Sequence, residues 1–122
     1  MKNFLEVLEN DIIYKNEYFF IIKDKYPVSP GHVLIISNLL KENFFELSQT
    51  EKENLSFTID NAKELIEQKY NPDGYNIGMN CGEDAGQTVM HCHIHLIPRR
   101  KGDMDNPEGG VRGVIPSRQR YN

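Results

Sequence analysis

Cysteine is scarce in this sequence, with only Cys81 and Cys92 among 122 residues and no C-x-x-C pair. That scarcity argues against a disulfide-stapled scaffold and against a zinc site built from thiolates, and it favours a reducing compartment. No apolar run approaches the roughly 20 residues that a membrane span requires. Glu6 and Glu9 also interrupt any leader-like apolar stretch near the N-terminus. We therefore expect a cytoplasmic protein that does not bind membranes.

The chain also has no excess of basic residues: it contains 14 Lys and Arg residues and 18 Asp and Glu residues, which gives a net charge of −4. The charge is uneven: from Arg99 onward six basic residues outnumber three acidic ones, which leaves −7 on the preceding part of the chain. An acidic main body argues against binding to nucleic acid. The basic C-terminal segment suits an anionic small substrate such as a phosphate ester, or it is simply a solvated tail.

The length and the 39% hydrophobic content predict one globular domain. Apolar runs at 11–14 and 18–22 predict a β-hairpin, and 32–36 predicts a buried strand after a loop fixed by two prolines and a glycine. Residues 48–70 predict the one long helix, with a capping box formed by Ser48 and Glu51 or by Thr50 and Glu53. A short strand is expected at 75–79. This order predicts an α+β fold, a mainly antiparallel sheet with one long helix on a face.

Three of the four histidines lie in the stretch G-Q-T-V-M-H-C-H-I-H-L-I-P-R-R, residues 86–100. His91, His93 and His95 are spaced two apart, with apolar or small residues between them. Alternate residues of a β-strand share a face, whereas residues two apart on a helix do not. The spacing therefore predicts a strand with three imidazoles on one face, ended by Pro98, which has no N–H to donate.

Three interpretations of this histidine row remain open from the residues alone. One imidazole can attack phosphorus to give a covalent intermediate, while its neighbours position phosphate oxygens and move protons. Alternatively, the row can bind a metal, because catalytic zinc is often held by three histidines. The histidines can also be structural, each satisfied by hydrogen bonds. A fourth histidine, His32, lies in the strand expected at 32–36 and makes the structural interpretation the weakest.

The same stretch resembles the signature of the histidine triad (HIT) family, His-φ-His-φ-His-φ-φ with φ apolar. The upstream segment S-P-G-H-V-L-I-I-S, residues 29–37, is similar to the P-G-H strand of that family, and the likeness extends over roughly residues 11–104. The resemblance implies a HIT-like α+β protomer that forms a homodimer. It also implies binding of a purine nucleotide and transfer or hydrolysis at the α-phosphate, without a cofactor.

The resemblance carries over to four histidines with separate roles. His93 would be the nucleophile that forms a nucleotidyl-histidine intermediate, and His95 would contact the phosphate oxygens. His91 would hold the hydrogen-bonded arrangement around the nucleophile, with His32 as an outer partner. The matching nucleotide-binding positions are Asp24 for the ribose, Ile22 and Lys25 beside the base, Asn80 near the α-phosphate, and Gln87 and Thr88 near the leaving group. From the residues alone, Asp24 is as well explained as a cap of its own loop.

Some bacterial relatives of this kind bind a structural zinc through N-terminal cysteines, which this chain lacks, so we expect no metal. Asn80 resembles the branch that cleaves adenosine phosphoramidates, whereas the run P-R-R-K-G-D after the triad resembles the branch that cleaves dinucleoside polyphosphates. Both substrates have the form AMP–X. A phosphorylase with phosphate as acceptor, and a nucleotide sensor or metal-binding protein without turnover, are the alternatives. We expect a domain over 1–104 and a tail over 105–122 that packs on the body or on a dimer partner.

Overall fold

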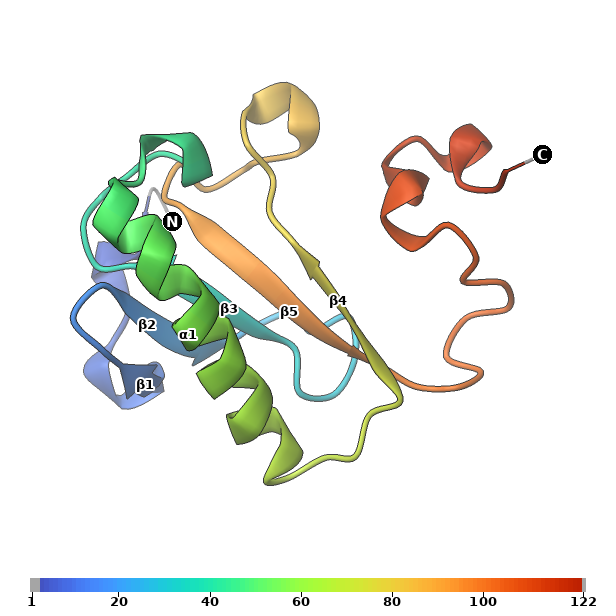
Figure 1. The fold of residues 1–122 in the computed structure, drawn as a ribbon, viewed down its shortest axis with the longest axis horizontal. Helices are drawn as coiled ribbons and strands as arrows, with labels where there is room; N and C mark the ends of the chain where they lie inside the picture. Colours follow the sequence, from blue (N-terminus) through green and yellow to red (C-terminus); the bar gives the residue numbers. More distant parts are fainter. Residues whose placement is uncertain (1–2, 122) are drawn as a thin grey trace.

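Five strands form one antiparallel sheet in the order β1-β2-β3-β5-β4 (Figure 1). The computed structural model describes residues 3–121; residues 1, 2 and 122, which the predicted domain and tail ranges include, lie outside the described part. The strands are β1 (Ile12–Lys15), β2 (Phe19–Lys23), β3 (Val33–Ser37), β4 (Gly74–Gly78) and β5 (His93–Arg99). This arrangement confirms the predicted α+β fold. Within residues 3–121, no helix combines the length and the apolarity needed to cross a membrane.

One long helix, α1 (Gln49–Glu67), lies across a single face of the sheet (Figure 1). It begins at the predicted capping box, in which Glu51 N donates to Ser48 Oγ at 3.1 Å and Ser48 N donates to Glu51 Oε1 at 2.7 Å. The helix ends three residues before the predicted Tyr70. The predicted end was wrong because the backbone tightens into a turn after Glu67, in which Lys69 N donates to Ile66 O, only three residues back, at 3.1 Å.

The two faces of the sheet carry separate apolar clusters, which explains why β2 and β3 are apolar at almost every position. The cluster under α1 combines alternate strand residues, such as Ile35 and Ile94, with Leu55, Ala62 and other helix residues. The opposite face carries a smaller cluster, which consists of Phe4, Phe20, Ile22, Leu34 and Ile36. Strands buried on both faces need no polar alternation.

Strand β5 runs through Pro98, so the prediction that this proline ends the strand was wrong. Pro98 is opposite Tyr75 of β4, and its carbonyl accepts a hydrogen bond from Ser29 Oγ at 2.5 Å. The side of Pro98 that lacks an N–H therefore faces the loop before β3, where no strand is paired with it. The pairing of β3 with β5 stops at Val33 and Leu96, and a proline beyond that point costs the ladder no hydrogen bond.

Short 3₁₀ turns lie near both ends of the described residues, 3–121. Near the N-terminus these turns are Phe4–Glu6 and Glu9–Asp11. In the tail, Gly110–Val114 and Pro116–Arg118 form two more turns that lie beside the edge strand β4 (Figure 1). The large apolar side chains of the tail remain exposed: Val111, Val114, Ile115 and Tyr121.

The capping box of α1 gives a stability prediction. Replacing Ser48 with alanine removes the acceptor for Glu51 N and should lower the free energy of unfolding by about 1 kcal/mol. Urea denaturation followed by circular dichroism measures this. Ser56→Ala is the matched control, since Ser56 is exposed in the same helix and its Oγ makes only a 3.5 Å contact with Glu53 O. Equal loss in both variants would contradict a specific role for the cap.

Candidate active site

The pairing of β3 with β5 decides which face of the sheet carries His93 and His95. His93 is opposite Ile36, and His95 is opposite Leu34. Directly paired residues share a face, so both imidazoles stand on the face opposite α1, beside the smaller apolar cluster. The burial pattern of β5 alternates accordingly, with Ile94 and Leu96 buried and the two histidines only partly buried. An open row of imidazoles therefore borders an apolar patch.

His91 does not belong to this row, so the prediction of three imidazoles on one strand face was wrong. The residue precedes β5 in a bend, and its ring is fully buried. Phe4 N donates to its Nδ1 at 3.0 Å, and its Nε2 lies 2.7 Å from Ser37 O. A carbonyl only accepts, so Nε2 carries the hydrogen and the ring is neutral. The ring thereby links the N-terminal turn to the end of β3 through two hydrogen bonds.

A main-chain carbonyl determines which nitrogen of the His93 ring carries a hydrogen. Its Nδ1 lies 2.7 Å from the carbonyl oxygen of His91. Because that oxygen can only accept, Nδ1 carries the hydrogen, and in a neutral ring the lone pair is then on Nε2. The ring of Phe4 packs edge-on against His93, with centroids 5.0 Å apart. His93 therefore presents a free nitrogen lone pair, which is the requirement for a nucleophile.

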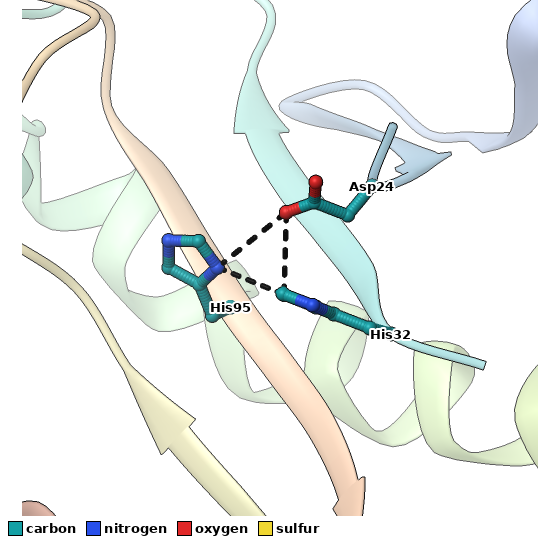
Figure 2. A group of neighbouring side chains, drawn as sticks. All are labelled: Asp24, His32 and His95. Carbon is teal, nitrogen blue, oxygen red and sulfur yellow. Dashed lines mark hydrogen bonds and ion pairs between the residues drawn. The ribbon is translucent and has the colours of Figure 1, made fainter. Parts of the chain in front are cut away.

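His95 has the opposite arrangement. Val28 N donates to His32 Nδ1 at 3.0 Å, so the hydrogen of a neutral His32 is on Nε2. That nitrogen lies 2.9 Å from His95 Nδ1, which must accept (Figure 2). The hydrogen of His95 is consequently on Nε2, where it is available as a donor to a ligand. The two imidazoles of the row thus offer one acceptor and one donor.

Asp24 lies against the same pair of rings (Figure 2). One carboxylate oxygen accepts from Tyr26 N at 2.8 Å and caps the loop. The other oxygen lies 3.4 Å from His32 Nε2 and 3.9 Å from His95 Nδ1. The loop cap expected of Asp24 is therefore present, and its role at a ribose stays a proposal. The sequence did not predict that the same carboxylate lies next to His32 and His95.

Burial keeps three of these rings neutral at pH 7. The pKa of His95 is lowered to about 4, chiefly by burial and further by the neighbouring His93 and His32. Burial also lowers the pKa of His32, against the opposing influence of Asp24, and it lowers the pKa of His91. Neutral rings each carry a single hydrogen, so the main-chain contacts determine where it lies.

Asp24, His32 and His95 are also the three described side chains whose donor atoms lie close enough to hold a metal ion, within 4.8 Å of one another. Two imidazoles and a carboxylate are a donor set that zinc accepts. The nitrogens that would bind the ion are instead joined by a hydrogen bond, and His32 Nε2 carries the hydrogen. The arrangement fits a hydrogen-bonded pair and does not fit a metal site without rearrangement.

The remaining predicted nucleotide-binding residues lie in different surroundings. Ile22 is buried in the apolar cluster beside the histidine row, directly opposite Leu34. Asn80 is half-buried and borders a cavity together with His95. Lys25 and Thr88 are exposed. Ile22 and Asn80 are thus near His95, and the contacts of all four residues with a nucleotide stay proposals.

Gln87, which the resemblance places near the leaving group, is bonded to the main chain. Its side chain is buried, and its Nε2 donates to Glu42 O at 2.6 Å and Val89 O at 3.1 Å. Its Oε1 accepts from Gly82 N at 2.8 Å. Both amide hydrogens are thus occupied by the main chain, so the geometry favours a strut that holds the 80–86 loop over a substrate contact.

Phe4 and Ser37 are the site residues that the sequence did not reveal. Phe4 precedes His91 by 87 positions in the chain, and no local sequence pattern predicts the hydrogen bond from its amide to His91. Ser37 contributes only its carbonyl oxygen, which every residue possesses. The position of Ser37 at the end of the P-G-H strand was the one available signal.

Comparisons with known proteins agree with this geometry. Residues 6–102 match the model of the HIT domain. Over 100 residues the chain is 33% identical to a bis(5′-adenosyl)-triphosphatase of Dictyostelium discoideum, covering 82% of this chain and 67% of that protein. It is 33% identical over 94 residues to an asymmetrical bis(5′-nucleosyl)-tetraphosphatase of Schizosaccharomyces pombe, covering 77% and 52%. A HIT family protein from Bacillus anthracis superposes with a TM-score of 0.71 at 33% identity, covering 76% and 66%.

The neutral buried histidines give a pH prediction. Their pKa values are lower in the folded chain than the usual 6.5, so below pH 6.5 the unfolded chain binds more protons. The free energy of unfolding should therefore rise between pH 4.5 and 6.5, by on the order of 1–3 kcal/mol, and level off above. Urea denaturation across this range measures it. His95→Gln should flatten the rise, and an unchanged slope in that variant would contradict the assignment.

Proposed function

Because the chain belongs to the HIT family, we propose that it is a nucleotide hydrolase that cleaves AMP–X substrates at the α-phosphate. Dinucleoside polyphosphates are the substrate class that we favour over adenosine phosphoramidates. The names of two relatives, a triphosphatase and a tetraphosphatase acting on dinucleoside compounds, support that choice. We expect AMP or another nucleoside monophosphate as one product and X as the other.

The opposite hydrogen positions on His93 and His95 are the observation that carries the proposal. His93 Nε2 attacks the α-phosphorus with its lone pair, and the bond from phosphorus to X breaks with its electrons on X. His95 Nε2–H donates to a non-bridging phosphate oxygen and stabilises the charge that develops there. Water then attacks the nucleotidyl-histidine, a proton is lost, and the nucleoside monophosphate leaves with His93 neutral again.

The main chain assists the attacking ring throughout. As Nε2 forms its bond to phosphorus, the imidazole becomes positive, and the hydrogen on Nδ1 is then shared more strongly with the carbonyl oxygen of His91. His91 is itself held by Ser37 and Phe4, so this carbonyl cannot turn away. The role of His91 in the proposal is accordingly to position the nucleophile without touching the substrate.

For the nucleoside we propose the apolar patch beside the histidines. Ile22 and Leu34 of the smaller apolar cluster are opposite each other and next to His95 in the sheet, each 6% exposed, and the exposed Lys25 follows β2 in the chain. Asp24 is assigned to the ribose hydroxyls, since a carboxylate accepts two hydrogen bonds at once. Asn80 and Thr88 are assigned to the phosphate and leaving-group side, and His32 to holding His95 in its donor form.

We also infer a homodimer formed through β4, which is one of the two edge strands of the sheet. An edge strand leaves main-chain groups unpaired on one side and readily pairs with another chain. Ile77 of β4 is 48% exposed, and the two turns of the tail lie beside the same edge (Figure 1). The reducing cytoplasmic compartment expected from the two cysteines, both of which are free, stays a prediction.

The nucleophile gives the decisive test of the function. His93→Ala should lower kcat on diadenosine tetraphosphate by about 10³-fold or more, because no other side chain supplies the attacking lone pair. Thermal shift with AMP should still show binding, since the nucleoside patch is intact. Brief incubation of wild-type protein with labelled substrate should place the label on a histidine. Retained turnover in the variant, or a tightly held transition metal in untagged wild-type protein, would reject the mechanism.

The dimer is tested by sedimentation velocity at micromolar concentration. Wild-type protein should sediment as a dimer, and Ile77→Lys should sediment as a monomer because a buried unpaired charge at the edge is costly. Leu8→Lys is the matched control, since Leu8 is likewise exposed, at 69%, but lies at the N-terminal end of the chain. A monomeric wild type would refute the inference.

A further inference from the structure

A cavity of about 520 Å³ lies beyond His95 on the open face of the sheet. Asn76 and Ile97 form part of its floor, Val28 borders it from the loop before β3, and Val111 and Val114 border it from the tail. This volume is in the usual range for small-molecule sites. A second cavity of about 550 Å³ lies between the N-terminal turns and β1, and none of the four histidines lines it. Of these two cavities, the one bordered by the tail is the one that His95 and Asn80 line.

The charges around this cavity compensate one another. Arg99 and Asp103 are its only charged lining side chains among the described residues, apart from the neutral His95. Arg99 Nη2 and Nε donate to the two oxygens of Asp103 at 2.7 and 2.9 Å, and Arg99 Nη1 donates to Asn76 Oδ1 at 2.7 Å. The guanidinium is therefore already neutralised. A polyphosphate chain, which needs uncompensated positive charge, is a poor match for this space.

Two amide groups at the cavity have fixed orientations. The oxygen of Asn76 accepts from Arg99, so its Nδ2 hydrogens are left to serve as donors. Gln119 Nε2 donates to Glu108 O at 3.1 Å, so its Oε1 is left to serve as an acceptor. An amide donor and an amide acceptor between aliphatic walls are the groups that recognise the edge of a nucleobase, as Asn and Gln do with adenine.

The tail that forms one wall is tied to itself. Gly109 has φ +87°, and a Cβ there would collide with the carbonyl oxygen of Gln119. The same carbonyl accepts from Arg112 Nε at 3.2 Å, and Arg112 lies over the ring of Tyr121 at 4.5 Å. These contacts hold the two turns as one unit, so the wall exists before any ligand arrives.

From this geometry we propose that the cavity binds the nucleoside of the leaving group, an inference that rests on the hydrolase function proposed above. Residues on one face of a strand are roughly 6.6 Å apart, so Ile97 lies about 13 Å along β5 from His93. The attacked nucleotide occupies the patch at Ile22, the phosphate chain passes His95, and the second nucleoside lies between Ile97 and Val111. The tail thereby selects dinucleoside substrates over nucleotides with small leaving groups.

Val111→Trp tests the proposal, because a bulky ring at this exposed tail position fills the cavity without touching the histidines. The substrates are diadenosine tetraphosphate and adenosine 5′-tetraphosphate, which share the attacked phosphate and the chain but differ in the second nucleoside. We expect kcat/KM for the dinucleoside compound to fall at least about tenfold, and that for adenosine 5′-tetraphosphate to stay within about twofold. Ile115→Trp is the control, a tail residue of similar exposure that does not line the cavity.

Each outcome decides one point. Equal loss on both substrates in Val111→Trp means that the cavity takes the phosphate chain, and no loss on either means that it takes nothing; both results overturn the proposal. A selective loss in Ile115→Trp also overturns it, because the tail then acts without the cavity. If wild-type protein turns over neither substrate, the proposed function itself fails, and that result is distinct from a failure of the cavity.

Discussion

A carbonyl oxygen only accepts a hydrogen bond and an amide N–H only donates one, and this constraint organises the whole site. The carbonyl of His91 places the hydrogen of His93 on Nδ1, and the amide of Val28 places that of His32 on Nε2. Because His32 Nε2 donates to His95 Nδ1, the hydrogen of His95 is on its Nε2, and His95 can donate to a ligand. Two chemically identical side chains on one strand thus acquire complementary properties from main-chain groups that have no freedom to change.

That constraint acts only on rings that carry a single hydrogen, and burial favours this neutral form at His32, His91 and His95. Desolvation is the largest influence on His32, His91 and His95, and it lowers the pKa of each. Asp24 opposes the effect at His32 and His95 from 3.4 and 3.9 Å without reversing it. The pair is therefore both neutral and next to a carboxylate. This combination keeps His95 Nε2–H available as a donor and holds an acceptor oxygen beside the pair, as the proposed contacts with phosphate and ribose require.

The surrounding scaffold holds these main-chain groups in place. Gln87 ties the 80–86 loop to Glu42 and Val89, and Cys92 N donates to Lys41 O beside the histidine strand. Lys41 in turn lies 3.6 Å from Glu51, the buried carboxylate of the helix cap. The start of α1 and the start of β5 are consequently joined through one set of polar contacts. Gln87 is buried and both of its amide hydrogens are bonded to main-chain carbonyls, so its side chain holds this part of the scaffold in place.

The sequence by itself determined the elements and their order. Apolar runs located four of the strands to within one residue, Ser48 and Glu51 located the start of α1, and the alternation of His93 and His95 with aliphatic residues indicated a strand with a functional face. Local patterns of this kind suffice because they depend on neighbouring residues alone. Pro98 and the strand position of His91 were misjudged because their surroundings come from distant parts of the chain, namely the end of the β3 pairing and the amide of Phe4. The bond from Gln87 to the carbonyl of Glu42 was not predicted for the same reason. Only the tertiary structure decided which histidine nitrogen is free, since hydrogen positions on an imidazole follow from partners that the sequence does not bring together.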